Sequence, residues 1–316
     1  MSQESGAQVR FFQVDAERQG QRLDNFLLLH LKGVPKSLLY RLLRKGQIRV
    51  NGKRAKPDQR VLAGDKVRVA PLVTKESQQV PPVASDLSRL LHSSLLFEDD
   101  CLRIINKPAG LAVHGGSGVQ LGLIEAARQV WQADRFLELV HRIDRDTSGV
   151  IVMARKRSAL RAMHEQLRLH QMRKQYWCLV VGAWSTKVKQ VDVPLLRQQR
   201  ASGERVVRVN QQGQQAKTMF KLLAANNAVS WLQASPVSGR THQIRVHCQH
   251  AGHAILGDDK YACAPDLLWA KDQGVKRLCL HAASLQFRHP KTEQLVRVEA
   301  TMPTDMGNLV SKWGLR

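Results

Sequence analysis

The chain has 316 residues, of which 43% are hydrophobic and 24% are charged, so it is long enough for two domains and apolar enough to bury a core. Its 49 Lys and Arg outnumber its 26 Asp and Glu, which gives a formal net charge of +23. Such a charge attracts polyanions, above all nucleic acid. An acidic membrane surface is the competing partner, but no apolar run approaches the roughly 20 residues of a membrane span.

Cysteine usage and the N-terminus bear on the compartment. The five Cys are widely spaced and form no Cys-x-x-Cys pair, which disfavours both a disulfide framework and a cysteine zinc site. The N-terminus has no basic stretch leading into an apolar one, so we expect no secretory signal. Both features predict a cytoplasmic protein with reduced thiols.

Residues 1–75 are predicted to form a basic domain, because they hold 16 Lys or Arg against 6 Asp or Glu. Apolar periodicity predicts one helix over 22–30 and a second that begins near residue 36 and ends at Gly46. Alternating residues predict strands at 48–50 and 67–69, with Asn51-Gly52 as a hairpin turn after the first.

The basic side chains of this domain concentrate on the second helix and the following turn. They are Arg41, Arg44, Lys45, Lys53 and Arg54. The order of helices, strand and hairpin resembles the S4 RNA-binding domain, through Gln21-Arg-Leu-Asp24, Leu38–Gly46 and Val50-Asn-Gly-Lys53. A solvated charged surface is the alternative explanation, but the charges are focused and lack compensating acids, so we expect these five residues to bind RNA.

A polar, Pro-containing stretch at 76–90 is predicted to be a linker, and residues 91–316 a larger α and β domain. Within that domain we expect a buried strand over 150–154, a helix around 159–167, and strands at 176–184, 231–234 and 243–247.

The segment His141-Arg-Ile-Asp-Arg-Asp-Thr-Ser-Gly149 places a carboxylate and a guanidinium side by side just before the buried strand. If it is extended, Arg142 and Asp144 point the same way and Ile143 points into the core. By itself the segment could equally be a surface ion pair followed by a turn.

This segment resembles the signature of the RluA family of pseudouridine synthases, with Ile143 where Leu is usual. Four further blocks match the family in order: Asn106-Lys-Pro-Ala-Gly110, Lys174-Gln-Tyr176, Gly239-Arg-Thr-His-Gln-Ile-Arg-Val-His247, and Leu280-His-Ala282 with His289-Pro290. Lys32-Gly-Val-Pro-Lys-Ser37 and Val113-His-Gly-Gly-Ser-Gly118 look most like the RluC subgroup, which modifies 23S ribosomal RNA. With the S4-like segment, the resemblance covers nearly the whole chain.

The resemblance implies an α+β fold: a pseudouridine synthase domain with a mixed, largely antiparallel sheet, preceded by a small S4-like α/β domain. It implies that uridine is isomerised without a redox step, so no cofactor or metal is expected. By the matching positions, Asp144, Tyr176 and Arg245 are the catalytic residues, and Arg142 fills the gap left by a flipped uridine. We also expect RNA contacts from Lys107, Arg240 and His242, which lie in the matching blocks.

Several alternatives stay open or are weaker. The substrate could be another RNA, such as transfer RNA, or the chain could be a non-catalytic RNA-binding assembly factor. The histidines at 242, 247, 250 and 253 could bind a metal, but their spacing is irregular. Ser148 lacks the Gly-x-Ser-x-Gly elbow of a hydrolase. We therefore expect a monomeric enzyme acting on 23S ribosomal RNA or a pre-ribosomal large subunit, with no membrane partner.

Overall fold

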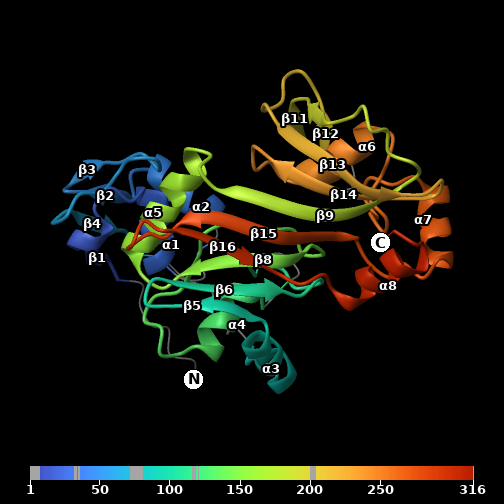
Figure 1. Ribbon diagram of the computed structural model, residues 1–316. Coiled ribbons are helices and arrows are strands. Elements are labelled where there is room, and N and C mark those ends of the chain that lie inside the picture. Colours follow the sequence, from blue (N-terminus) through green and yellow to red (C-terminus); the bar gives the residue numbers. More distant parts are fainter. Residues whose placement is uncertain are drawn as a thin grey trace, which may run out of the picture. The chain divides into compact units, whose positions relative to one another are not determined.

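The computed structural model describes residues 8–31, 34, 36–71, 81–115, 119, 121–199 and 204–315. The chain divides into two compact units, residues 1–80 and 81–316 (Figure 1). Within the described ranges, none of the helices combines the length and apolar character that crossing a bilayer requires.

The first unit packs two helices against a small antiparallel sheet whose strand order is β1-β4-β2-β3. Its elements are β1 (Arg10–Gln13), η1 (Ala16–Arg18), α1 (Leu23–His30), α2 (Lys36–Arg44), β2 (Ile48–Val50), β3 (Lys53–Arg54) and β4 (Lys66–Val69). Asn51 and Gly52, with φ of 50° and 77°, form the predicted turn between β2 and β3. Leu39, Leu42 and Leu43 of α2 are buried, so the predicted apolar stripe of that helix is confirmed.

The second unit is built on a ten-stranded sheet, counted over the described residues, with a central order of β10-β13-β14-β9-β15-β8-β6-β5. Strands β7 and β16 pair at its side with β8 and β15, and a separate hairpin joins β11 to β12. The strands are β5 (Leu95–Glu98), β6 (Leu102–Lys107), β7 (Glu138–Leu139), β8 (Ser148–Ala154), β9 (Arg173–Val181), β10 (Gln190–Asp192), β11 (Leu195–Gln199), β12 (Arg205–Val209), β13 (Lys217–Ala225), β14 (Val229–Pro236), β15 (Leu280–Arg288) and β16 (Leu295–Glu299).

The helices of this unit are α3 (Ser85–Ser93), α4 (Leu123–Val130), α5 (Arg157–Arg168), α6 (Gln243–His250), α7 (Ala264–Asp272) and α8 (Thr304–Lys312). Strands β8 and β15 pair in parallel, and the other described neighbours pair antiparallel, so the prediction of a mixed, largely antiparallel sheet is confirmed. The long strands β9 and β15 cross the middle of the sheet, and α6 lies beside β13 and β14 (Figure 1).

The predicted strand over 243–247 is wrong, because Gln243–His250 forms helix α6. Ile244 and Val246 alternate with polar residues, a spacing that is typical of a strand with one exposed face. All six residues from Gln243 to Cys248 are nevertheless buried, and the polar ones have specific partners. Alternation therefore carried no information about exposure in this segment.

The predicted boundaries at 1–75, 76–90 and 91–316 stay a prediction, with one difference inside the linker. Residues 85–93 form α3, because Leu87 and Leu91 pack in the same apolar cluster as Ile105 of β6 and Leu123 of α4. The part of the predicted linker that contains Pro81 and Pro82 therefore leads directly into a packed helix. The first part of that linker, and portions of the two RluC-like segments at 32–37 and 113–118, lie outside the described residues.

Candidate active site

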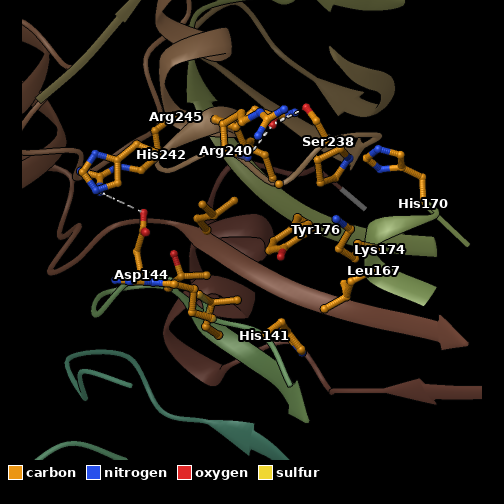
Figure 2. Close-up of a pocket in the computed structure, with 18 of the residues that line it drawn as sticks. His141, Asp144, Leu167, His170, Lys174, Tyr176, Ser238, Arg240, His242 and Arg245 are labelled. Carbon is orange, nitrogen blue, oxygen red and sulfur yellow. Dashed lines mark hydrogen bonds and ion pairs between the residues drawn. The ribbon is translucent and has the colours of Figure 1, made fainter. Parts of the chain in front are cut away.

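A cavity of about 590 Å³ opens in the second unit and brings together segments that lie far apart in the sequence (Figure 2). The segment between β7 and β8 supplies Asp144, β9 supplies Tyr176, and α6 supplies Arg245. The cavity is thus lined by all three residues that the sequence analysis predicted to be catalytic. Arg142, Arg240 and His242 also line it.

The central interaction joins Asp144 to Arg245. Arg245 Nη1 donates to Asp144 Oδ2 at 3.2 Å, and His242 Nε2 lies 3.8 Å from the same oxygen. The Asp144 side chain retains 26% of its exposure, whereas that of Arg245 retains 5%. The carboxylate therefore faces the cavity while its cation is held behind it.

Arg245 is fixed by a second carboxylate that the sequence analysis missed. Asp258 is fully buried, and its two oxygens accept from Arg245 Nε at 2.8 Å and Nη2 at 2.7 Å. Burial disfavours the charged guanidinium, but the hydrogen bonds to Asp258 and the nearby charges outweigh it, so the pKa of Arg245 is raised. The only signal in the sequence is the polar run Gly257-Asp-Asp-Lys-Tyr261 after an apolar pair.

The turn before α6 is organised by Gln243. Its Oε1 accepts from Ser238 Oγ at 2.7 Å and from the Arg240 amide at 3.0 Å, while its Nε2 donates to the Lys217 carbonyl at 2.9 Å. His242 adopts a left-handed conformation with φ of 53°, and its Nδ1 lies 2.6 Å from the Tyr261 hydroxyl. This turn delivers His242 to Asp144, and burial lowers the pKa of His242.

Tyr176 lies in β9 opposite a small residue on each neighbouring strand. Its register partners are Ala234 of β14 and Ala282 of β15, and Tyr176 itself lines the cavity. Burial, and to a smaller degree the charge of Asp144, raises the pKa of the phenol, so Tyr176 stays protonated at neutral pH. An apolar ring with a neutral hydroxyl can stack on a base and exchange a proton with it.

The segment that carries Asp144 is held by the residues on either side of it. The Thr147 amide donates to the Asp144 carbonyl at 3.2 Å, and Ile143 is buried as predicted. Gly149 has φ of +115°, and a Cβ there would lie 2.2 Å from the Ala282 carbonyl oxygen. The Gly of the signature is thus required by the close approach of β8 to β15.

Lys107, an expected RNA contact, lies in the interior of the second unit, and its contact with RNA stays a prediction. Its side chain is fully buried, and Nζ donates to the carbonyls of Pro108, Leu111 and Arg145 at 2.7, 2.8 and 2.9 Å. Burial lowers its pKa to about 7, and the charges of Asp146 and Asp144 oppose that change. The three acceptors match the three N–H bonds of an ammonium. Lys107 therefore ties two loops of the cavity region together.

Arg142 and Arg240 are exposed at the cavity. Arg240 Nε donates to the Gln215 carbonyl at 3.2 Å, whereas Arg142 has no hydrogen bond or ion pair with any residue that the structure describes. Arg142 is therefore free to enter a bound RNA, as the sequence predicts.

The predicted RNA-binding residues of the first unit are all exposed: Arg41, Arg44, Lys45, Lys53 and Arg54. Arg54 Nε lies 2.9 Å from the position that a Cβ at Gly46 would take, so the β2–β3 hairpin folds back onto the end of α2. This contact joins the basic residues of the helix and the hairpin into one surface.

One cluster of metal-ligand type occurs among the described residues, and none of its members lines the cavity: Asp99, Cys101 and His289. His289 Nε2 lies 2.7 Å from Asp99 Oδ2, and Nδ1 accepts from the amides of Lys291 and Thr292. Because both ring nitrogens are occupied, we assign this cluster to structural contacts. The absence of a metal and a cofactor stays a prediction.

Comparison with known proteins decides the family. A sequence model described as RNA pseudouridylate synthase matches residues 102–250, and one described as S4 domain matches residues 21–67. Ribosomal large subunit pseudouridine synthase C of Escherichia coli is 48% identical over 308 residues, or 96% of each chain. The chain belongs to the RNA pseudouridylate synthase family. The enzyme of that name from Yersinia pestis is 49% identical and covers 94% of this chain and 93% of its own length.

A solved structure supports the same assignment. Human RNA Pseudouridylate Synthase Domain Containing 4 is 27% identical, with a TM-score of 0.60, and the match covers 73% of this chain and 97% of that one. The family consists of isomerases, so this chain is an enzyme of that class. The predicted family, the α+β fold and the S4 domain are therefore confirmed.

Proposed function

We propose that this protein isomerises specific uridines of 23S ribosomal RNA to pseudouridine in the cytoplasm. Support for the substrate comes from the relatives named ribosomal large subunit pseudouridine synthase C, which align with nearly the full chain. The formal charge of +23 and the exposed basic surface of the S4 domain suit an RNA partner.

The observation that carries the catalytic assignment is the contact of Asp144 with Arg245 at 3.2 Å inside a cavity that Tyr176 also lines. The cavity accepts a uridine only after the base has left its stack. A carboxylate in such a site tends to protonate once substrate removes its water, and the Arg245 guanidinium opposes this by favouring the charged form. The Asp144 carboxylate therefore meets the ribose with the Arg245 guanidinium fixed behind it.

The reaction conserves all atoms. The N1–C1′ bond breaks, the uracil turns while Tyr176 lies against it, and a C5–C1′ bond forms. C5 then loses its hydrogen as a proton, and N1 gains one. Asp144 acts on the ribose during bond exchange, and the neutral Tyr176 hydroxyl relays the proton by donating its own as it accepts the one from C5. No electrons are exchanged with another molecule.

Release of tritium from C5 tests this function. Unmodified 23S ribosomal RNA transcribed with [5-³H]uridine should lose label to water when the full-length protein is added, and transfer RNA should not. Asp144→Asn should reduce the rate at least a thousandfold, about 4 kcal/mol in barrier. Asp146→Asn is the matched control, since Asp146 pairs with exposed Arg145 and does not line the cavity.

Each outcome is decisive. Label released only from transfer RNA would move the substrate to another RNA, and binding without release would make the chain a non-catalytic RNA-binding factor. Residual turnover of Asp144→Asn within tenfold of wild type would remove Asp144 from the chemistry.

A further inference from the structure

Lys174 lies in the same cavity but has no place in the chemistry described above. It is two positions before Tyr176 in β9, so both side chains leave the same face of the strand. Figure 2 shows Lys174 beside Tyr176, toward His170 and Ser238. Its Nζ lies 3.7 Å from the position that a Cβ at Gly239 would take, an ordinary contact distance, so the ammonium group lies beside Gly239 at the cavity.

The ammonium of Lys174 has no counter-charge within the part of the chain that the structure describes. Among the residues that the structure describes, none forms a hydrogen bond or an ion pair with it. His141, which shares the cavity, is neutral, because burial and, to a smaller degree, Lys174 lower its pKa to about 4. Asp144 is the single acid among the described lining residues, and it is already paired with Arg245.

Half-burying an unpaired cation lowers the stability of the folded protein. The same burial lowers the pKa of Lys174, because it disfavours the charged form. A group of this kind in a cleft indicates a functional contact rather than a structural one. RNA carries one negative charge on each phosphate, which is the kind of anion that such a cation binds.

We propose that Lys174 binds a phosphodiester group adjoining the flipped uridine. This inference rests on the proposed function, because it requires RNA in the cavity. A uracil carbonyl would give Lys174 a hydrogen bond but would leave its charge uncompensated, whereas a phosphodiester satisfies both. The contact would fix the sugar–phosphate backbone while Tyr176 meets the base and Asp144 the ribose.

Neutral backbone linkages test the contact. Three copies of a short RNA would carry a uridine mapped in modified 23S ribosomal RNA: one unaltered, one with a methylphosphonate on its 5′ side and one with it on its 3′ side. Binding would be measured with full-length protein carrying Asp144→Asn to prevent turnover. We expect one of the two linkages to weaken binding roughly tenfold to a hundredfold, the range of a hydrogen bond to a charged group.

Adding Lys174→Met should weaken binding of the unaltered RNA by a similar factor and abolish the sensitivity to that linkage. The slope of log affinity against log salt should fall by about 0.7–0.9, one phosphate contact. Lys187→Met, which removes an exposed charge outside the cavity, should preserve the sensitivity to the linkage.

Stability separates this role from a structural one. Lys174→Met removes an unpaired cation, so the protein should be no less stable than its parent toward urea. The proposal is overturned if neither methylphosphonate weakens RNA binding by the protein that keeps Lys174. It is also overturned if the methylphosphonate and Lys174→Met weaken binding additively, the result expected if Lys174 contacts uracil instead. Tritium release by wild-type protein is independent of these results, so the proposed function can hold where this inference fails.

Discussion

Arg245 donates to both oxygens of Asp258, at 2.8 and 2.7 Å, and thereby leaves Nη1 as the nitrogen that reaches Asp144 at 3.2 Å. The guanidinium thus binds two acids at once: the buried Asp258 orients it, and the accessible Asp144 accepts its remaining hydrogen bond. Because the first pair is bidentate, the direction of Nη1 is set before RNA arrives.

Asp258→Asn should therefore damage both stability and turnover. It removes the charge of the one fully buried carboxylate that pairs with Arg245 and leaves the accessible Asp144 and Asp259, so we expect a loss of about 3–5 kcal/mol in the free energy of unfolding. We also expect kcat to fall at least tenfold, about 1.4 kcal/mol in barrier, because Nη1 loses its fixed direction. Denaturant titration and tritium release measure the two effects.

Asp259→Asn provides the control for this variant. Asp259 is 73% exposed and lies 3.7 Å from Arg245, so its loss should change stability by no more than about 0.5 kcal/mol. If Asp258→Asn keeps kcat within twofold of wild type, Asp258 does not orient the catalytic pair.

Two glycines with positive φ allow steric crowding to be separated from backbone strain. Gly149→Ala places a Cβ 2.2 Å from the Ala282 carbonyl oxygen at φ of +115°. We expect crowding and strain together to cost about 2–5 kcal/mol in unfolding free energy. Gly110→Ala, at φ of +84° with no atom within 4 Å, should cost only about 1–2 kcal/mol. Equal losses in thermal unfolding would contradict the close approach of β8 and β15.

Much of the site could be predicted from sequence because its reacting residues lie in short, contiguous motifs. Asp144, Tyr176 and Arg245 are each flanked by characteristic neighbours, and the fold gathers them in one cavity. Asp258 could not be found in this way, because its partner is 13 residues distant and meets it only after α6 and the following turn have formed.

What the sequence did not reveal has a common physical cause, which is the burial of polar residues. Lys107 was expected at the RNA because it lies in a matching block, and the structure holds it in the interior through three carbonyls. The predicted strand over 243–247 is instead helix α6, in which Gln243 and His247 are buried with Thr218 as a shared partner. Composition and periodicity do not reveal such partners.

Two fully buried histidines predict that the protein loses stability in mild acid. His247 Nδ1 forms a hydrogen bond with the Thr218 hydroxyl, and His281 Nδ1 with the Ser148 hydroxyl, each at 2.9 Å. Burial lowers the pKa of each histidine to about 4. Between pH 6.5, the ordinary histidine value, and pH 4, the unfolded chain binds protons that the folded one excludes. Stability is therefore complete above this window and falls as the pH drops through it.

The expected slope is up to about 1.4 kcal/mol per pH unit for each histidine. Urea titrations at a series of pH values across this window should show it, and His281→Gln should make the slope smaller. His164→Gln, on the exposed face of α5, should leave the slope unchanged. A free energy of unfolding that is constant across the window would show that these histidines are protonated in the folded protein.

The basic surface of the S4 domain should be visible in the salt dependence of binding. Replacing Arg41 and Arg44 by Gln should reduce the slope of log affinity against log salt by about 0.7–0.9 for each phosphate that the protein no longer binds. The control replaces Lys271 and Lys276, which are exposed in the second unit, by Gln and so removes the same charge. If both double variants change the slope equally, the effect is one of net charge and the S4 surface is not the anchor.

Arg142 should matter most when the target uridine is stacked in a folded RNA. Its side chain is exposed at the cavity and has no partner among the described residues, so it can fill the space that a flipped base vacates. Arg142→Ala should lower kcat/KM on a hairpin RNA roughly tenfold to a hundredfold, because the gap then remains unfilled while the stack is broken. On an unstructured strand with the same uridine there is little stack to replace, and the loss should be under about threefold.

Arg145→Ala, which removes an exposed arginine paired with Asp146, should affect both RNAs alike and weakly. Equal, large losses on both RNAs after Arg142→Ala would instead place Arg142 in the chemistry beside Asp144.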